Sequence, residues 1–419
     1  MKVLSRLHSL LAGACLSAAV VCSPALASAQ APAAEPAPAA QPGSVVGSWP
    51  TSHPGSSRGV TATKIHYAST LMDGRPTTVS GVVFEPSAPW SGPGERPTVV
   101  FAPGTRGAGD QCAPSNAGGQ TSGFALGPAK QLTYNANYEY PFFQTAAERG
   151  IRVVVTDYIG LGTPGYHTYV NHIEEAHATL DAARAGLRFA GASPDAPVGF
   201  AGYSQGGGAA AAAAEFAASY APDLNVKGTY AGAPPADLHQ VMKAVDGSAI
   251  AHVLGYAVNG YSARSAEFYN EIVPEMNARG RQFLNSAAHA CVSDSAATWG
   301  FTRTEQLTKS GESFSALLSR KPTASRMLAE QKLGQHPLNA PMMVANSPHD
   351  DLIPYEQARM MAGAYCAQGG TVLFEATNPV DILPKTGTNH AVPMFSSMPR
   401  GLDYLIERFH DVPAPSNCM

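Results

Sequence analysis

Ser204 is the residue whose surroundings most clearly indicate chemistry, because glycine stands two positions to either side of it, at Gly202 and Gly206. Residues 198–203 before it form an apolar run typical of a buried strand, and residues 209–214 after it are all alanine, the strongest helix former. A serine at such a junction is exposed on a sharp turn, and a side chain at either glycine would collide with the neighbouring strand or helix. The chemistry that this arrangement serves is nucleophilic attack on a carbonyl carbon.

The same turn predicts where negative charge would be stabilised. The backbone N–H of Gln205 faces the spot beside the Ser204 hydroxyl, at the positive end of the following helix, so it would donate to an oxyanion. A second donor is expected from the loop after an earlier strand, where the backbone or side chain of Thr105, the N–H of Arg106, and Asp110 are candidates. The frame Gly-x-Ser-x-Gly between strand and helix is the nucleophile elbow of α/β-hydrolases.

A serine hydroxyl reacts only when a base takes its proton and a carboxylate orients that base. In this fold the three residues follow the chain order serine, acid, histidine, each in a loop after a late strand. His390, between the last predicted strand and the C-terminal helix, is the expected base, and Asp350, after the strand at residues 340–346, is the expected acid. Asp351 is the second choice and is expected to cap the next helix; His349 is beside the acid and could not face it.

One group of residues suggests a metal site: His167, His172, Glu174, Glu175 and His177. A zinc-binding helix carries two histidines four positions apart, whereas His172 and His177 are five apart and point to different sides. We therefore expect solvated or helix-start residues here, and no bound metal.

Short apolar or β-branched runs alternate with helical patterns along most of the chain, which predicts a mostly parallel central sheet with right-handed crossovers. Strands are expected at residues 62–67, 77–84, 97–102, 151–158, 198–203, 226–232, 340–346 and 371–375, and helices at residues 173–189, 354–367 and 391–409. An Asp-Gly pair between the first two strands predicts a hairpin. Further helices are expected at residues 250–261, 266–278 and 312–318, as part of a mainly helical cap over the catalytic face.

The chain begins with a predicted secretory signal peptide at residues 1–29, followed by an Ala- and Pro-rich linker at residues 30–47. The remaining length of about 370 residues suits one core with an inserted subdomain. We assign residues 48–234 and 336–419 to the core and residues 235–335 to the helical cap.

The net charge and the cysteine content bear on the partners of the protein and on its cellular compartment. The formal net charge is −4 and basic clusters are scarce, which argues against nucleic acid as a partner. Four cysteines remain after the signal peptide and allow three pairings, which agrees with export to an oxidising compartment. We favour Cys112 with Cys291 and Cys366 with Cys418; the second pair would fasten the proline-rich C-terminal tail to the core.

Several motifs together resemble the secretory lipase family, which includes fungal lipase A and many secreted actinobacterial lipases. The resemblance covers nearly all of the chain from residue 48 to its end. The motifs that carry it are Gly104-Thr105-Arg106-Gly107, Cys112-Ala113-Pro114-Ser115, Asp157-Tyr158-Ile159-Gly160-Leu161-Gly162, Gly202-Tyr203-Ser204-Gln205-Gly206-Gly207, and the late Asp350 and His390. The resemblance implies an α/β-hydrolase with a helical cap, a Ser-Asp-His triad, no metal requirement, hydrolysis of acyl esters and the disulfide pairing given above. In some members an aspartate near the first cysteine contributes to the oxyanion hole, a role that Asp110 would take here.

The sequence therefore predicts a secreted, extracellular or periplasmic, serine ester hydrolase that forms an acyl-enzyme and needs no cofactor. Its substrate is expected to be a small-molecule or lipid ester, with transient contact to a lipid interface, and the protein is expected to be a monomer. The alternatives are a serine peptidase or acyltransferase on the same fold, or a non-catalytic lipid-binding protein.

Overall fold

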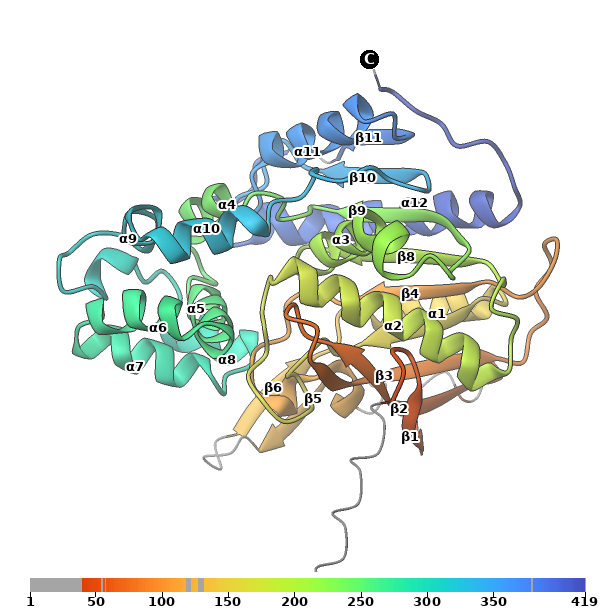
Figure 1. Ribbon diagram of the computed structural model, residues 1–419, viewed down its shortest axis with the longest axis horizontal. Helices are drawn as coiled ribbons and strands as arrows, with labels where there is room; N and C mark the ends of the chain where they lie inside the picture. Colours follow the sequence, from red (N-terminus) through yellow and green to blue (C-terminus); the bar gives the residue numbers. More distant parts are fainter. Residues whose placement is uncertain are drawn as a thin grey trace, which may run out of the picture. The chain divides into compact units, whose positions relative to one another are not determined.

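A computed structural model describes residues 40–53, 56, 58–117, 122–126, 132–377 and 380–418. In this part of the chain, nine strands form one sheet (Figure 1). Their spatial order is β1 (Val45–Thr51), β2 (Val60–Thr70), β3 (Pro76–Pro86), β7 (Arg152–Thr156), β4 (Thr98–Ala102), β8 (Val198–Tyr203), β9 (Val226–Gly232), β10 (Met342–Asn346) and β11 (Val372–Ala376).

The sheet is antiparallel at one side and parallel at the other. Strands β1, β2, β3 and β7 pair antiparallel, and the pairs from β7 through β4, β8, β9 and β10 to β11 are parallel. The predicted hairpin joins β2 to β3, with Gly74 at a φ of 83° in the turn and the Leu71 N–H bonded to the Arg75 carbonyl at 2.8 Å. The predicted α/β fold with a mostly parallel sheet is confirmed.

The first strand of the sheet begins before residue 48, where the sequence analysis placed the start of the core. Strand β1 begins at Val45, which pairs with Tyr67 of β2, so the last residues of the segment assigned to the linker (30–47) belong to the sheet. The predicted signal peptide (1–29) and the first ten residues of that linker lie outside the described residues.

Helices cover both faces of the sheet. Helices α2 (His172–Ala190), α3 (Gln205–Tyr220) and α11 (Tyr355–Ala367) pack on one face, while α1 (Tyr140–Glu148) and α12 (Thr388–Phe409) pack on the other (Figure 1). The alanine run lets α3 lie close to the strands, and every residue from 209 to 213 is fully buried. None of the described helices is both apolar and long enough to cross a bilayer.

Between β9 and β10 the described chain contains helices and no strand, and we call residues 238–330 the helical segment. The helices of this segment are grouped beyond one end of the sheet (Figure 1). Its helices are α4 (Leu238–Val245), α5 (Val253–Arg264), α6 (Ala266–Ile272), α7 (Ala278–Ala287), α8 (Val292–Trp299), α9 (Phe314–Arg320) and α10 (Pro322–Glu330). The predicted helix at 266–278 is divided, because α6 ends at Ile272 and α7 begins only at Ala278.

A small hairpin that the sequence analysis missed stands apart from the main sheet. Strands β5 (Ser122–Leu126) and β6 (Leu132–Ala136) pair antiparallel, and α8 packs against β6. Nearby, the disulfide between Cys112 and Cys291 links the loop after β4 to the start of α8. The helical segment is thus fastened covalently to the core loop that carries the predicted second oxyanion donor.

The C-terminal tail closes the exposed edge of the sheet at β11. The Asn417 side chain exchanges hydrogen bonds with the Phe374 main chain at 2.8 Å, the Ser416 hydroxyl donates to the Val372 carbonyl at 3.0 Å, and a disulfide joins Cys418 to Cys366 on α11. An edge strand covered in this way cannot pair with another chain.

We expect the double substitution Cys366→Ser, Cys418→Ser to lower the free energy of unfolding by about 2–4 kcal/mol, because it frees a long loop in the unfolded chain. Urea unfolding followed by circular dichroism would measure the loss, and kcat should remain within twofold of wild type. An unchanged unfolding midpoint would mean that this disulfide contributes nothing to stability.

Candidate active site

Ser204 lies between β8 and α3 in a strained backbone conformation, with a φ of 62° and a ψ of −127°. Its N–H donates to the carbonyl of Gly232 on the neighbouring strand at 2.9 Å, which holds the turn in place. A Cβ on Gly202 would lie 2.1 Å from the Gly206 carbonyl oxygen, and a Cβ on Gly206 would lie 2.0 Å from that of Ala102. Both glycines are therefore required by backbone contacts, and the turn presents the serine hydroxyl to the pocket described below.

Asp350 and His390 form a hydrogen-bonded pair. The His390 Nδ1–H donates to Asp350 Oδ2 at 2.8 Å, and Asp350 Oδ1 accepts the N–H groups of Leu352 at 3.0 Å and Ile353 at 2.8 Å. The Asp350 side chain is fully buried and that of His390 is 10% exposed. Because Nδ1 carries the proton, Nε2 is left as the free acceptor of the imidazole ring.

His390 lies in the first turn of α12, and not in the loop where the sequence analysis placed it, because α12 begins at Thr388. The hydroxyl of Tyr203, the residue before the serine, donates to the His390 carbonyl at 2.7 Å, and the two rings lie 5.2 Å apart. This contact brings the histidine beside the elbow, although the two residues are 187 positions apart in the chain.

The neighbouring Asp351 does not cap the helix after it, as the sequence analysis expected. Helix α11 follows Pro354 and has no side-chain cap, while Asp351 Oδ2 accepts the N–H of Gly387 at 2.8 Å. Gly387 is the N-cap of α12, so Asp351 holds the start of the helix that carries His390.

Of the residues predicted to contribute to the oxyanion hole, some lie at the pocket beside Ser204 and one does not. Gln205 opens α3 and lines the pocket beside Ser204, and the Thr105 hydroxyl pairs with that of Tyr169, another lining residue, at 2.8 Å. The structure does not bring Asp110 to this pocket, because Asp110 Oδ1 accepts the N–H of Gly162 at 2.9 Å at the protein surface.

A buried carboxylate that the sequence analysis missed organises the loop of Thr105. Glu139 accepts the Gly104 N–H on both oxygens, at 3.0 and 3.2 Å, and binds Arg106 Nη2 at 2.7 Å, with both charged side chains 1% exposed. Burial raises the pKa of Glu139, and Arg106 and the Gly104 N–H oppose that rise. The sequence signal was a single acidic residue within the aromatic stretch Tyr138 to Phe143, where a charge needs a partner.

The five residues that suggested a metal site are buried, so the expectation of solvated side chains was wrong, whereas His172, Glu174 and Glu175 do lie at the start of a helix, as the other half of that expectation had it. Glu174 is paired with Arg264 of α5 at 2.7 Å, and His172 lies 2.6 Å from the Gln331 carbonyl. These partners come from the helical segment and its C-terminal end, far along the chain. Among the residues that the structure describes, no group of three or more His, Cys, Asp or Glu side chains could hold a metal ion.

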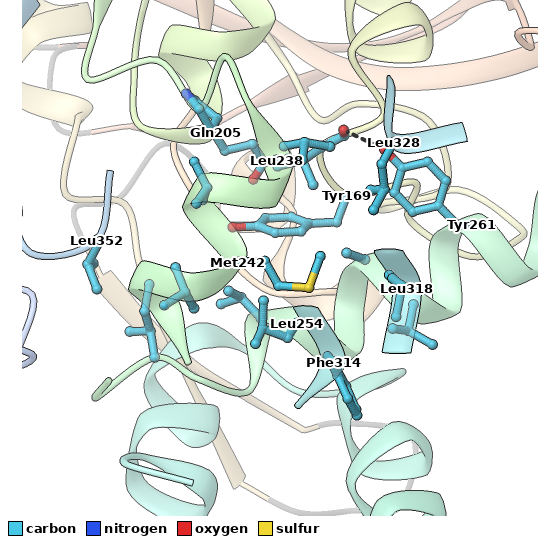
Figure 2. A pocket seen from close by; sticks show the side chains of 18 of the residues that line it. Tyr169, Gln205, Leu238, Met242, Leu254, Tyr261, Phe314, Leu318, Leu328 and Leu352 are labelled. Carbon is cyan, nitrogen blue, oxygen red and sulfur yellow. Dashed lines mark hydrogen bonds between the residues drawn. The ribbon is translucent and has the colours of Figure 1, made fainter. Parts of the chain in front are cut away.

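An apolar pocket with a cavity volume of about 70 Å³ is lined in part by Ser204 (Figure 2). Ser204 and Gln205 are among its lining residues, and most of the others are apolar side chains of the helical segment. Members labelled in Figure 2 are Tyr169, Gln205, Leu238, Met242, Leu254, Tyr261, Phe314, Leu318, Leu328 and Leu352. Such a lining would hold a hydrocarbon chain and would offer little to a charged ligand.

The sequence is similar to those of known lipases. A protein of Mycobacterium tuberculosis named "Probable inactive lipase" is 28% identical over 359 residues, which cover 84% of this chain and 75% of that protein. The "Secreted triacylglycerol lipase LIP5" of Malassezia furfur is 25% identical over 319 residues, covering 73% of this chain and 77% of that protein.

Solved structures share the fold. Candida antarctica lipase A in its closed state aligns with a TM-score of 0.75 at 21% identity, covering 90% of this chain and 84% of that one. The cell wall degrading esterase LipA from Xanthomonas oryzae, in a ligand-bound form, aligns with a TM-score of 0.69 at 20% identity, covering 88% of this chain and 100% of that one. The sequence model of the family described as "Secretory lipase" matches residues 127–417. Because this match spans well over half of its length, the chain belongs to the secretory lipase family, a family of ester hydrolases.

Proposed function

We propose that this protein is a serine esterase or lipase that cleaves esters of apolar acyl chains, with Ser204 as nucleophile, His390 as base and Asp350 as the residue that orients the base. The observation that carries the proposal is the Asp350–His390 pair held beside the elbow of Ser204, at the mouth of an apolar pocket.

The chemistry follows from this geometry. Ser204 Oγ attacks the ester carbonyl while His390 Nε2 takes the serine proton, and the carbonyl π electrons move to the oxygen. Collapse of the tetrahedral intermediate breaks the bond to the alcohol, which leaves with the proton from His390, and a covalent acyl-enzyme remains. Water, deprotonated by the same histidine, then attacks the acyl carbon and releases the acid, with Ser204 protonated again.

Two donors are proposed for the oxyanion. The Gln205 N–H lies at the N-terminus of α3, where the helix dipole also favours negative charge. The Thr105 hydroxyl is the second, since it can donate to the oxyanion while accepting from the Tyr169 hydroxyl.

The helical segment is proposed as the cap that shields the acyl chain. It supplies most of the pocket walls and is tied to the core by the Cys112–Cys291 disulfide. Apolar side chains near His390 are exposed, among them Ile382 at 44%, Leu383 at 56% and Phe395 at 61%. They support transient contact with a lipid interface.

Secretion is supported by the secreted relatives and by the two disulfides, which persist in oxidising compartments. The relative named as inactive raises the alternative of a lipid-binding protein without catalysis. Covalent labelling of Ser204 by a fluorophosphonate would exclude that alternative.

We expect Leu254→Trp to fill the pocket and to lower kcat/KM for p-nitrophenyl palmitate by about tenfold or more, while p-nitrophenyl acetate is hydrolysed as before. Leu254 lines the pocket and is 8% exposed, so a larger ring has to enter the space of the acyl chain. Rates on esters from acetate to palmitate would measure the shift.

Leu254→Met, which conserves volume, is the matched control and should keep the chain-length profile. Equal losses on acetate and palmitate in the tryptophan variant would contradict the assignment of this pocket to the acyl chain. Cleavage of aminoacyl amides in preference to esters by the wild type would favour a peptidase.

A further inference from the structure

Gln205 carries a long polar side chain that the elbow itself does not need. The turn uses only the main-chain N–H of this position, which any residue except proline supplies. The side chain is nevertheless 3% exposed, and Figure 2 shows its amide nitrogen turned away from the apolar pocket. A buried amide must have hydrogen-bond partners, so the surroundings of Gln205 define what it does.

Both N–H bonds of that amide are used. Gln205 Nε2 donates to Glu175 Oε1 at 2.8 Å and lies 3.1 Å from His167 Nε2. His167 Nδ1 lies 3.2 Å from the Ile159 carbonyl, which can only accept, so Nδ1 carries the ring proton and Nε2 accepts from Gln205. Glu175 Oε1 also accepts the Val170 N–H at 3.0 Å.

The same network reaches the other side of the oxyanion hole. The His167 ring stacks on Tyr158 with centroids 5.9 Å apart, and the Tyr158 hydroxyl donates to the Pro103 carbonyl at 2.8 Å. Pro103 begins the loop that carries Thr105. The network of Glu175, His167 and Tyr158 therefore contacts both elements that supply the proposed oxyanion donors.

We propose that Glu175 and His167 are positioning residues for the oxyanion hole, because they hold the Gln205 side chain and thereby fix the peptide N–H between Ser204 and Gln205. This inference rests on the proposed function and adds to it two residues that do not touch the substrate.

The groups that face Glu175 explain why a carboxyl is tolerated there. Glu174 is adjacent on α2 but is paired with Arg264 of α5, and the remaining titratable neighbours are His167 and the hydroxyls of Tyr158, Tyr169 and Tyr261. Burial raises the pKa of Glu175 to about 8, and the hydrogen bonds from Gln205 and Val170 limit the rise. Burial likewise lowers the pKa of His167 to about 4. Burial thus favours the uncharged form of both groups at neutral pH, so that Glu175 adds little negative charge behind the oxyanion.

The first test compares two substitutions at Glu175. Glu175→Ala should lower kcat on p-nitrophenyl butyrate by about tenfold with KM within twofold, which is less than the loss of a whole oxyanion donor. Glu175→Gln keeps an oxygen acceptor for Gln205, and Glu175 Oε2 makes no hydrogen bond within the described residues that the change would break. This variant should recover kcat to within threefold of wild type.

Glu215→Gln, on the helix α3 that begins at Gln205, is the matched control. Glu215 is also buried, and it accepts three main-chain N–H groups at residues 334–336 and the Tyr365 hydroxyl at the far end of α3. Its substitution should change stability and leave kcat unaltered. Equal losses of kcat in Glu175→Ala and Glu215→Gln would overturn the proposal, since they would reflect general destabilisation.

The second test is the pH profile. Wild-type kcat should fall as the pH rises through about 8, where Glu175 ionises behind the oxyanion, and Glu175→Gln should lack this decline. The native state binds the Glu175 proton more tightly than the unfolded chain does. The unfolding midpoint of wild type should therefore fall relative to Glu175→Gln between pH 5 and about 8 and run parallel to it above that.

Identical pH profiles of kcat in wild type and Glu175→Gln would overturn the proposal, even if Glu175→Ala fails to fold. A fluorophosphonate separates this result from failure of the proposed function. If the reagent labels wild type at Ser204 while the Glu175 variants behave as wild type, only the positioning role is lost. If it does not label wild type, the proposed function itself fails.

Discussion

Replacing Ser204 by alanine is expected to lower kcat on p-nitrophenyl esters by about 10⁶, because it removes the hydroxyl on which the proposed acyl-enzyme forms. The loss should appear in kcat and not in KM, since the apolar pocket that binds the acyl chain remains. Steady-state rates, with circular dichroism to verify folding, would measure the effect. Fluorophosphonate labelling should disappear in the same variant.

A second serine–histidine pair in the chain provides the control. The Ser295 hydroxyl lies 2.7 Å from His252 Nδ1, and both residues are fully buried within the helical segment. His252 Nε2 is 2.9 Å from the Phe283 carbonyl, so this imidazole is oriented by a main-chain group in place of a carboxylate. Ser295→Ala should keep kcat within threefold of wild type. If Ser204→Ala retained most of the activity, the assignment of the nucleophile would be wrong.

The nucleophile elbow could be predicted because it depends on local sequence. Gly202 and Gly206 are required by main-chain contacts of the turn itself, and the strand before the turn and the alanines after it are equally local. The start of α12 was harder to predict. Gly387 and Pro393 are residue types that usually interrupt helices, yet the helix between them already includes His390.

The buried polar contacts around the site could not be predicted, since the hydrogen-bond and ion-pair partners of these groups are distant in the sequence. Glu174 and Glu175 follow one another on a helix that appeared solvated, yet Arg264 lies 90 positions away from the first and Gln205 lies 30 positions from the second. Only the fold reveals that these carboxyls are buried behind the nucleophile. Glu139 carried a signal in the sequence, its place within an aromatic stretch, although the sequence analysis missed it, whereas Glu174 and Glu175 carried none.

Asp350→Asn is expected to lower kcat by about 10⁴ at neutral pH with little change in KM, because it selects the wrong tautomer of His390. Asp350 Oδ1 accepts two main-chain N–H groups, so an asparagine must place its carbonyl oxygen there and turn its NH₂ toward His390 Nδ1. Nδ1 would then accept, Nε2 would carry the proton, and the ring could no longer take the proton of Ser204. Asp351→Asn is the matched control: among the described residues its carboxylate accepts the Gly387 N–H, which an amide oxygen can also accept, and kcat should fall by less than about tenfold. A larger loss in Asp351→Asn than in Asp350→Asn would reverse the assignment of the acid.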